Sequence, residues 1–323
     1  MAPQSESLRK RALGDTGLMV DPLSVGCAPL GDMPETFAYS VAEEQALATY
    51  RAVLQGPINF LDTAASYGDG ESERRLGIVL RELGGIPPGF VVATKADRNL
   101  QTGDYGGDQV RRSVERSLRL LGLDRLQFCY LHDPEHTPFE AAMSPGGPVE
   151  ALRRCRDEGL IEHIGVAGGP IAMMIRYVET GLFEAAISHN RYTLINTSAD
   201  AFWEACRRHG VAAVNAAPYG SGILAKGPSA YPRYAYQDAP AELVQRAGRL
   251  EAVCARHGVP LGAAALQFSL RDPRIASTIV GISRPERLEQ TMALALHPIP
   301  EQLWAELAQV APTTEDPEAG RWG

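Results

Sequence analysis

The sequence is poor in cysteine and has no closely spaced pair of cysteines. Its 323 residues include five cysteines, and no CxxC pattern occurs among them. They are Cys27, Cys129, Cys155, Cys206 and Cys254. An odd number of scattered cysteines favours reduced thiols over a disulfide framework, and the lack of paired cysteines argues against a structural zinc. We therefore predict no metal site.

The sequence also lacks an excess of positive charge and a long apolar run. Lys and Arg number 31 against 39 Asp and Glu, a formal net charge of -8, which gives no basic footprint for nucleic acid or an anionic membrane. No stretch reaches the roughly 18 consecutive apolar residues of a spanning helix, and residues 1–10 lack the apolar core of a signal peptide. We expect a cytoplasmic monomer or small homo-oligomer that acts on a small molecule.

Short apolar stretches alternate with helical patterns along most of the chain. The predicted strands cover residues 23–26, 58–62, 90–95, 126–132, 163–166, 185–189, 211–216 and 277–280. Helical spacing covers residues 42–54, 71–83, 108–121, 149–157, 170–179, 199–209, 242–270 as two helices, and 285–296. Strands that are apolar on both faces are typical of a parallel sheet covered by helices. Eight such units predict an α/β fold, a closed (β/α)8 TIM barrel.

The length alone is compatible with one large domain or two ordinary ones. A doubly wound sheet would place Gly-x-Gly-x-x-Gly after its first strand, and residues 26–31 (GCAPLG) do not supply it. We therefore predict a single domain over residues 1–323, with a barrel core at about 22–296. A β-hairpin at residues 11–21 closes the bottom. The loop 225–239 lies over the mouth, and the polar tail 313–323, with Trp322, either dangles or folds back.

Three neighbouring strands each end in an ionisable residue. These are Asp62, Lys95 and His132, and Tyr67 follows in the loop after the second strand. The carboxyl ends of barrel strands form the active-site rim, so these side chains are expected to converge. A purely structural pair of Asp62 with Lys95 is the alternative. It does not account for His132 at the equivalent place on the next strand.

The motifs that carry these residues resemble those of the aldo-keto reductases over nearly the whole chain. They are Asp-Thr-Ala-x-x-Tyr-Gly at residues 62–68, followed by Glu73, then Ala-Thr-Lys at 93–95 and Leu-His at 131–132. The resemblance implies a catalytic tetrad of Asp62, Tyr67, Lys95 and His132. It also implies a nicotinamide cofactor, NADP or NAD.

The four residue types suit alcohol oxidation and carbonyl reduction. Tyrosine can serve as acid or base, but its unperturbed pKa of about 10 makes it a poor base near neutrality. An adjacent ammonium such as that of Lys95 lowers a pKa by roughly 1 to 3 units, while burial raises it. Asp62 keeps Lys95 charged, and His132 orients the reacting oxygen. Asp133 either tunes His132, contacts a polyol or lies on the surface.

Two loops resemble the family's cofactor-binding segments. Residues 217–224 resemble the pyrophosphate loop, for which a plain turn is the alternative, and residues 281–287 resemble the adenosine-side motif. The cofactor-binding residues predicted from them and from the end of the first strand are Gly26, Pro218, Tyr219, Gly220, Ser221, Gly222, Leu224, Gly281, Ser283, Arg284, Arg287 and Gln290. Arg284 and Arg287 are placed to meet a ribose 2'-phosphate. Gln290-Thr291 replaces a frequent Glu-Asn, so NAD and NADP both remain open.

Two further segments depart from the family pattern. Residues 167–169 (AGG) replace a common Ser-Asn that clamps the nicotinamide carboxamide. After the sixth strand, Tyr192 is expected to stack on the ring, while His189 or Asn190 takes the carboxamide. These departures resemble the branch of L-fucose and D-threo-aldose 1-dehydrogenases, which implies oxidation of an anomeric hydroxyl to a lactone. A pyridoxal 4-dehydrogenase, a general NADPH-dependent aldehyde or ketone reductase, and a cofactor-bound regulatory subunit are the alternatives.

Overall fold

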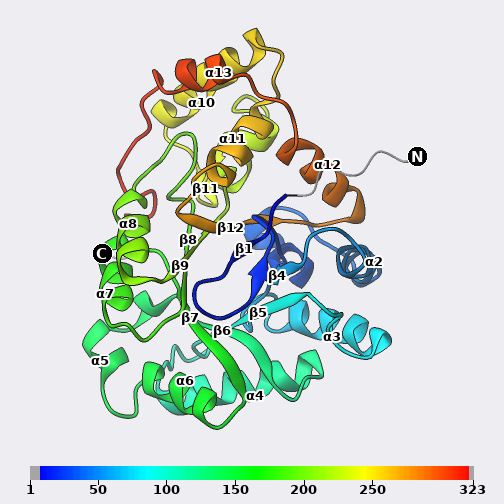
Figure 1. Cartoon of the computed structure of the whole chain (residues 1–323), viewed down its shortest axis with the longest axis vertical. Coiled ribbons are helices and arrows are strands. Elements are labelled where there is room, and N and C mark those ends of the chain that lie inside the picture. Colours follow the sequence, from blue (N-terminus) through cyan, green and yellow to red (C-terminus); the bar gives the residue numbers. More distant parts are fainter. Residues whose placement is uncertain (1–7, 320–323) are drawn as a thin grey trace.

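The computed structural model describes residues 8–319, and its centre is a closed barrel of eight parallel strands (Figure 1). The strand order is β12-β3-β4-β5-β6-β7-β8-β9, and β12 pairs with both β3 and β9 to close the ring. The barrel strands are β3 (Leu23–Gly26), β4 (Phe60–Asp62), β5 (Val91–Ala96), β6 (Leu126–His132), β7 (Ile161–Ala167), β8 (Ala185–His189), β9 (Ala212–Ala216) and β12 (Ile275–Gly281). The predicted TIM barrel is confirmed.

Helices follow the strands and surround the barrel (Figure 1). The longer ones are α2 (Glu43–Leu54), α3 (Glu71–Leu83), α4 (Gly107–Leu121), α6 (Pro148–Asp157), α7 (Ile171–Glu179), α8 (Asp200–His209), α10 (Ala241–Arg256), α11 (Leu261–Leu270) and α12 (Pro285–Ala295). Short helices that the sequence patterns did not predict are η1 (Ala28–Gly31), α1 (Pro34–Phe37), η2 (Pro134–His136), α5 (Phe139–Met143), η3 (Gly220–Gly222), α9 (Ile223–Lys226) and α13 (Glu301–Leu307).

The predicted N-terminal hairpin is present and closes the amino-terminal end of the barrel. Strands β1 (Arg11–Ala12) and β2 (Met19–Val20) pair antiparallel. Leu13 and Val20 are fully buried in the same apolar cluster as the barrel interior, and Arg11 donates hydrogen bonds to carbonyls that precede or begin β12. The opposite, carboxyl-terminal end of the strands is therefore the one left for loops and a site.

The apolar strand residues fill two regions, as burial on both faces of a parallel sheet requires. Phe60, Phe128 and Val214 belong to the interior cluster, whereas Leu61, Leu131 and Val166 pack outward under the helices. A second, smaller core lies under α9, α10, α11 and α13. Of these helices, α10, α11 and α13 are at the top of Figure 1. It buries residues of the loop after β9 and of the chain after β12.

The loop 225–239, expected to be irregular, contains a small hairpin. β10 (Arg233–Tyr234) and β11 (Gln237–Asp238) pair antiparallel, and the two residues between them, Ala235 and Tyr236, have φ of 49° and 63°. Positive φ at both central positions is the geometry of a two-residue type I′ turn. Neither residue is the Gly, Asn or Asp that usually marks such a turn, so sequence patterns do not predict this hairpin.

The polar tail folds back over the described part of the chain. Thr313 exchanges backbone hydrogen bonds with Ile195 and Thr197, and the Asn196 amide donates to the carbonyl of Glu315. The tail therefore runs beside the loop that follows β8. Trp322 lies outside the described residues. Among residues 8–319 no helix is long and apolar enough to cross a membrane.

Candidate active site

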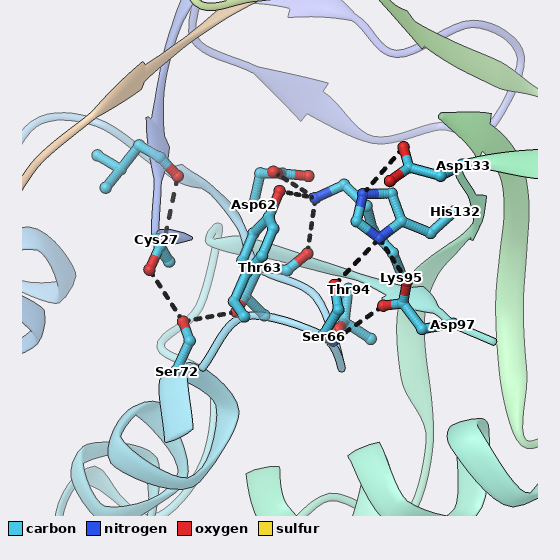
Figure 2. A network of polar contacts seen from close by, with 12 residues as sticks. Cys27, Asp62, Thr63, Ser66, Ser72, Thr94, Lys95, Asp97, His132 and Asp133 are labelled. Atoms are coloured by element: carbon cyan, nitrogen blue, oxygen red, sulfur yellow. Dashed lines mark hydrogen bonds and ion pairs between the residues drawn. The ribbon is translucent and has the colours of Figure 1, made fainter. Parts of the chain in front are cut away.

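Asp62, Lys95 and Tyr67 meet at the carboxyl ends of β4 and β5, within the network drawn in Figure 2. The Lys95 ammonium lies 2.6 Å from Asp62 Oδ2, 2.8 Å from the Thr63 carbonyl oxygen and 3.0 Å from the Tyr67 hydroxyl. Each of its three N–H groups therefore has an acceptor. The side chains of Asp62 and Lys95 are buried, so this pair is shielded from solvent screening.

The turn that holds Tyr67 is tied to the neighbouring strand and to η1. Thr63 and Ala65 donate backbone hydrogen bonds to carbonyls of β5. Gly68 has a φ of +61°, and a Cβ on it would lie 1.8 Å from the Gly31 carbonyl oxygen. No other residue fits this close approach, which explains the glycine after Tyr67.

Burial and charge act in opposite directions on this triad. Desolvation lowers the pKa of Lys95, but Asp62 and Tyr67 together hold it above its ordinary value, so the amine is an ammonium. For Tyr67, burial raises the pKa and Lys95 lowers it, and the net pKa lies above the ordinary value. The lowering by Lys95 expected from the sequence is present. With only the protein's own side chains present, Lys95 lowers the pKa of Tyr67 by less than desolvation raises it.

His132 ends β6 and is held by Asp97, a residue that the sequence analysis missed (Figure 2). Its Nδ1 lies 2.7 Å from Asp97 Oδ1, and the ring packs edge-on to Tyr67 with centroids 5.9 Å apart. Asp97 follows Lys95 by two residues, and alternation along a strand places such residues on one face. That spacing was the available signal.

Asp133 lies against the imidazole. Its Oδ1 is 3.6 Å from His132 Nε2, and its side chain remains 31% exposed. Of the three roles considered for Asp133, this contact supports the tuning of His132. Nearby, Glu135 has its pKa raised to about 7 by burial and by Asp133.

Glycines after β7 make room for charged side chains from other loops. A Cβ on Gly168 would lie 2.7 Å from Glu135 Oε2, and one on Gly169 would lie 3.0 Å from both Glu135 Oε1 and the Arg191 guanidinium. The backbone N–H of Gly169 donates to Glu135. The space that a family Ser-Asn would occupy is therefore filled by Glu135 and Arg191.

The segment after β8 is bound by the tail. Arg191 is fully buried and forms ion pairs with Asp316 at 2.7 Å and Glu318 at 2.9 Å. His189 Nε2 lies 3.1 Å from Glu318 Oε2. The sequence did not indicate this cluster, because its cations at 189 and 191 lie more than 100 residues from its carboxylates at 316 and 318.

Asn190 is the better placed of the two carboxamide candidates. It is fully buried with φ of 58°, and its Oδ1 accepts a hydrogen bond from Ser221. Within residues 8–319 its Nδ2 makes no hydrogen bond of normal geometry, and the Tyr236 hydroxyl lies nearby. A donor is therefore available at Asn190, whereas His189 is engaged by Glu318.

The prediction that Tyr192 stacks on a nicotinamide ring is wrong. Its ring packs against Phe268 and Trp203, with centroid distances of 5.0 and 5.9 Å. Its hydroxyl donates to Asp272 Oδ2 at 2.6 Å, in the turn before β12 at the amino-terminal end of the barrel. The loop after β8 carries the ring outside the barrel because that position buries it in a cluster of aromatic residues.

The loop after β9 has the unusual backbone expected of a phosphate cradle. Gly220, Ser221 and Gly222 have φ of 56°, 62° and 126°. Consecutive residues in such conformations turn their N–H groups into concave anion sites. Pro218 and Tyr219 precede them, and the Tyr219 hydroxyl is buried without a hydrogen bond within residues 8–319.

The prediction of Leu224 as a cofactor-binding residue is not supported by its placement. Its side chain is fully buried in the second core, under α9. Its backbone N–H donates to the Tyr219 carbonyl. Neither the side chain nor the backbone N–H is free to contact a ligand, because the side chain packs in the core and the N–H bonds within the turn that begins α9.

The remaining predicted cofactor residues lie at the ends of β3 and β12 and at the start of α12. Gly26 pairs in register with Gly281, and a Cβ on Gly26 would lie 2.8 Å from Ile279. The Ser283 carbonyl accepts a hydrogen bond from Gln45. The side chains of Arg284, Arg287 and Gln290 are exposed, as are those of Glu286 and Glu289 between them.

A cluster of cations joins these two loops. Burial lowers the pKa of Lys226, and the nearby charges of Arg287 and Arg233 lower it further. Lys226 also lies over the Tyr231 ring at 3.9 Å. Lys226 and Arg233 were not predicted from the sequence. An anion placed among these side chains would relieve their mutual repulsion.

The fold is shared with a solved structure. An aldo-keto reductase from Bacillus halodurans in its holo form superposes with a TM-score of 0.77 over 97% of this chain and 99% of that one, at 22% identity.

Sequence comparisons find relatives that match nearly the whole chain. A D-threo-aldose 1-dehydrogenase from a Pseudomonas species is 33% identical over 92% of this chain and 96% of its own. An L-galactose dehydrogenase from Arabidopsis thaliana is 31% identical, covering 88% and 86%. A pyridoxal 4-dehydrogenase from Microbacterium luteolum is also 31% identical, covering 92% and 96%. The model of the aldo/keto reductase family matches residues 22–312. The chain belongs to the aldo/keto reductase family and is an NAD(P)-dependent oxidoreductase.

Proposed function

We propose that this enzyme oxidises the anomeric hydroxyl of an aldose to a lactone, with Tyr67 as the acid/base. The observation that carries the proposal is the contact of 3.0 Å between the Tyr67 hydroxyl and Lys95, inside a buried pair with Asp62. In this arrangement a phenol has one adjacent ammonium to stabilise its anion. An ion pair between Asp62 and Lys95 with a purely structural role would not require a tyrosine hydroxyl beside the ammonium.

The side chains divide the work between proton and oxygen. Tyr67 removes the hydroxyl proton as the C–H bond breaks, and Lys95 stabilises the phenolate. Asp62 keeps Lys95 charged, and His132 donates a hydrogen bond to the reacting oxygen. When bound, an oxidised nicotinamide accepts the hydride, and its positive ring opposes the rise in the Tyr67 pKa that burial causes.

The residues fit a dinucleotide along the same rim. Asn190 offers a buried amide donor for the carboxamide, and residues 220–222 offer a concave backbone for phosphate oxygens. Arg287 and Lys226 supply positive charge beyond that loop.

Arg287→Ala tests the NAD or NADP choice. A loss of affinity for NADP alone assigns Arg287 to a 2'-phosphate, and an equal loss for both dinucleotides assigns it to the pyrophosphate.

The sugar assignment is supported by the polar rim and by two relatives whose names specify aldoses. Asp133 lies against His132, and Glu135 and the Tyr236 hydroxyl lie within electrostatic range of Asp133. Carboxylates accept hydrogen bonds from sugar hydroxyls and disfavour anionic substrates. An uncharged polyol therefore fits this rim better than a phosphorylated sugar.

Initial rates test the proposal. L-fucose and other neutral aldoses are supplied with NAD or NADP, and aromatic aldehydes with NADPH. We expect turnover of an aldose with formation of a lactone, detected as a hydroxamate. Strict preference for aromatic aldehydes would replace the proposal with a general reductase, and binding of a dinucleotide without turnover would favour a regulatory subunit.

Two variants identify the reaction as that of the described site. Tyr67→Phe should abolish turnover while leaving dinucleotide binding intact. Tyr177→Phe is the matched control, because its hydroxyl is also buried but has no hydrogen-bond partner within residues 8–319 and lies on α7. Equal activity of the two variants would show that Tyr67 does not carry the proton.

A further inference from the structure

We propose that Asp97 is a positioning residue for the reaction, fixing the imidazole of His132 so that Nδ1 bears a proton and the cationic ring directs Nε2–H to the reacting oxygen. The inference rests on the proposed role of the site. It adds a fifth side chain to the tetrad, from the loop that β5 enters.

The geometry assigns the tautomer. Asp97 Oδ1 lies 2.7 Å from His132 Nδ1, and Asp97 is 3% exposed. Its Oδ2 accepts the backbone N–H of Ser66 at 2.9 Å, and its own N–H donates to Ser113 at 3.0 Å. An ionised carboxylate can accept hydrogen bonds but cannot donate them. In the contact between His132 and Asp97, Nδ1 must therefore be the donor.

Asp97 differs in kind from Asp133, the other carboxylate near the ring. Asp133 lies 3.6 Å from Nε2, beyond a normal hydrogen bond, and is partly exposed. The Asp97 contact is short, buried and anchored from two other elements. A solvent-exposed charge is screened, whereas a buried one is not, so Asp97 is the partner that fixes the ring.

Other groups also face His132. Lys95 opposes its positive charge and Asp62 favours it, while the Tyr67 ring packs against it. His136 also lies within electrostatic range, and the Tyr105 hydroxyl donates to the His132 carbonyl oxygen. Burial lowers the pKa of His132, and Asp133 and Asp97 together raise it above its ordinary value. The carboxylates therefore outweigh desolvation and Lys95.

The protonated ring suits the reaction without itself transferring a proton. In oxidation, the hydroxyl proton passes to Tyr67 and the hydride to the dinucleotide, so the oxygen gains negative charge in the transition state. An Nε2–H donor stabilises that charge. A neutral ring with a proton only on Nδ1 would present a bare Nε2 to the same oxygen. Asp97 thus preserves the donor at the pH values where His132 would otherwise be neutral.

Direct observation of the wild-type ring gives the first test. Histidine 15N and 13C resonances of the free protein, with His132 assigned by a His132→Gln variant, report which nitrogen is protonated. We expect Nδ1 to be protonated at every pH. A neutral form with bare Nδ1 would overturn the proposal, and the measurement needs no substrate, so it can fail independently of the proposed function.

Asp97→Asn gives the second test, with Asp133→Asn as the matched variant. Removing the buried, adjacent charge of Asp97 lowers the pKa of His132. Above both pKa values the cationic fraction is then smaller, and kcat should fall with it by about tenfold, while the loss disappears at acidic pH. Asp97→Glu should restore part of the rate.

Asp133→Asn should move the pKa less, because its charge is partly exposed. An Asp97→Asn variant with an unchanged His132 pKa, or with a rate loss independent of pH, would reduce Asp97 to a structural role.

Discussion

The two sides of the barrel mouth are built in different ways. The tetrad side is formed by residues at the ends of three neighbouring strands, and the tail side by residues after β8 and in the chain's last segment. The tetrad side consists of Asp62, Tyr67, Lys95 and His132. The tail side consists of His189, Asn190, Arg191, Asp316 and Glu318.

The difference shows where chemistry is fixed and where it varies. On the tetrad side, charge is neutralised within adjacent strands, whose register positions Lys95 near Asp62. On the tail side, the ion-pair partners of buried Arg191 within residues 8–319 are Asp316 and Glu318, more than 100 residues away. The first arrangement depends on the barrel alone. The second depends on the tail staying in place, and it stands where this chain departs from the family pattern.

Lys95→Met should give the largest effect. Loss of the ammonium removes the group that stabilises the Tyr67 anion, and kcat should fall by roughly 10²- to 10⁴-fold. Dinucleotide affinity, measured by fluorescence titration, should change little. Lys10→Met, at an exposed position, is the control. If the Lys95 variant kept a tenth of the wild-type rate, the tetrad side would not be the centre of the chemistry.

Arg191→Met tests the tail side. It removes the buried guanidinium that pairs with both Asp316 and Glu318, and breaking a buried ion pair by removing one member costs about 3 to 5 kcal/mol. Urea unfolding measures the change. Arg207→Met removes an exposed pair with Glu204 and should cost less than about 1 kcal/mol. Equal effects would show that the tail's ion pairs contribute no more than surface ones.

Glu73→Gln probes the support behind the tetrad side. Thr94 donates to this fully buried carboxyl at 2.5 Å, and burial raises its pKa from 4.5 to about 7. The folded state therefore binds the proton more tightly, so wild-type stability should fall as pH rises between these values. The variant should gain up to about 3 kcal/mol relative to wild type across that window.

The neighbouring Glu71 supplies a control of opposite sign. Its pKa is lowered by Arg74, so the stability it contributes is lost as pH falls below 4.5. Thermal unfolding of Glu73→Gln and Glu71→Gln across pH separates the two carboxylates. Parallel pH profiles would mean that Glu73 is not held neutral in the folded protein.

Tyr192→Phe should give the smallest effect. Its hydroxyl bonds to Asp272, which Arg274 also contacts, so the loss should be about 1 kcal/mol of unfolding free energy. Because the ring lies outside the barrel, kcat and dinucleotide affinity should stay within about twofold of wild type. A large change in either would return Tyr192 to the cofactor site.

Much of the tetrad side could be predicted because its information is local. Asp62, Lys95 and His132 each end an apolar stretch, and the carboxyl ends of parallel strands share one rim. Asp97 lay within reach of the same argument, since it follows Lys95 by two residues directly after β5, where strand alternation would place it on the same face. The net direction of the Tyr67 pKa shift could not be predicted from the sequence, because desolvation depends on atoms packed from many parts of the chain.

The tail side was beyond sequence reasoning for a related cause. His189 and Tyr192 match a pattern by position, but the path of the loop after β8 decides where each side chain points. Tyr192 leaves the site because Phe268 and Trp203 offer it an apolar pocket. His189 is bound by Glu318 because the tail returns beside that loop.

The sequence by itself determined the barrel, its hairpin and the residues at its rim, because apolar periodicity and strand-end chemistry are properties of neighbouring residues. Only the tertiary structure decided which cation meets which carboxylate, as with Arg191 and the tail, and whether burial or charge prevails at Tyr67. Pairing and desolvation depend on distances in space, and those are set when segments far apart in the chain pack together.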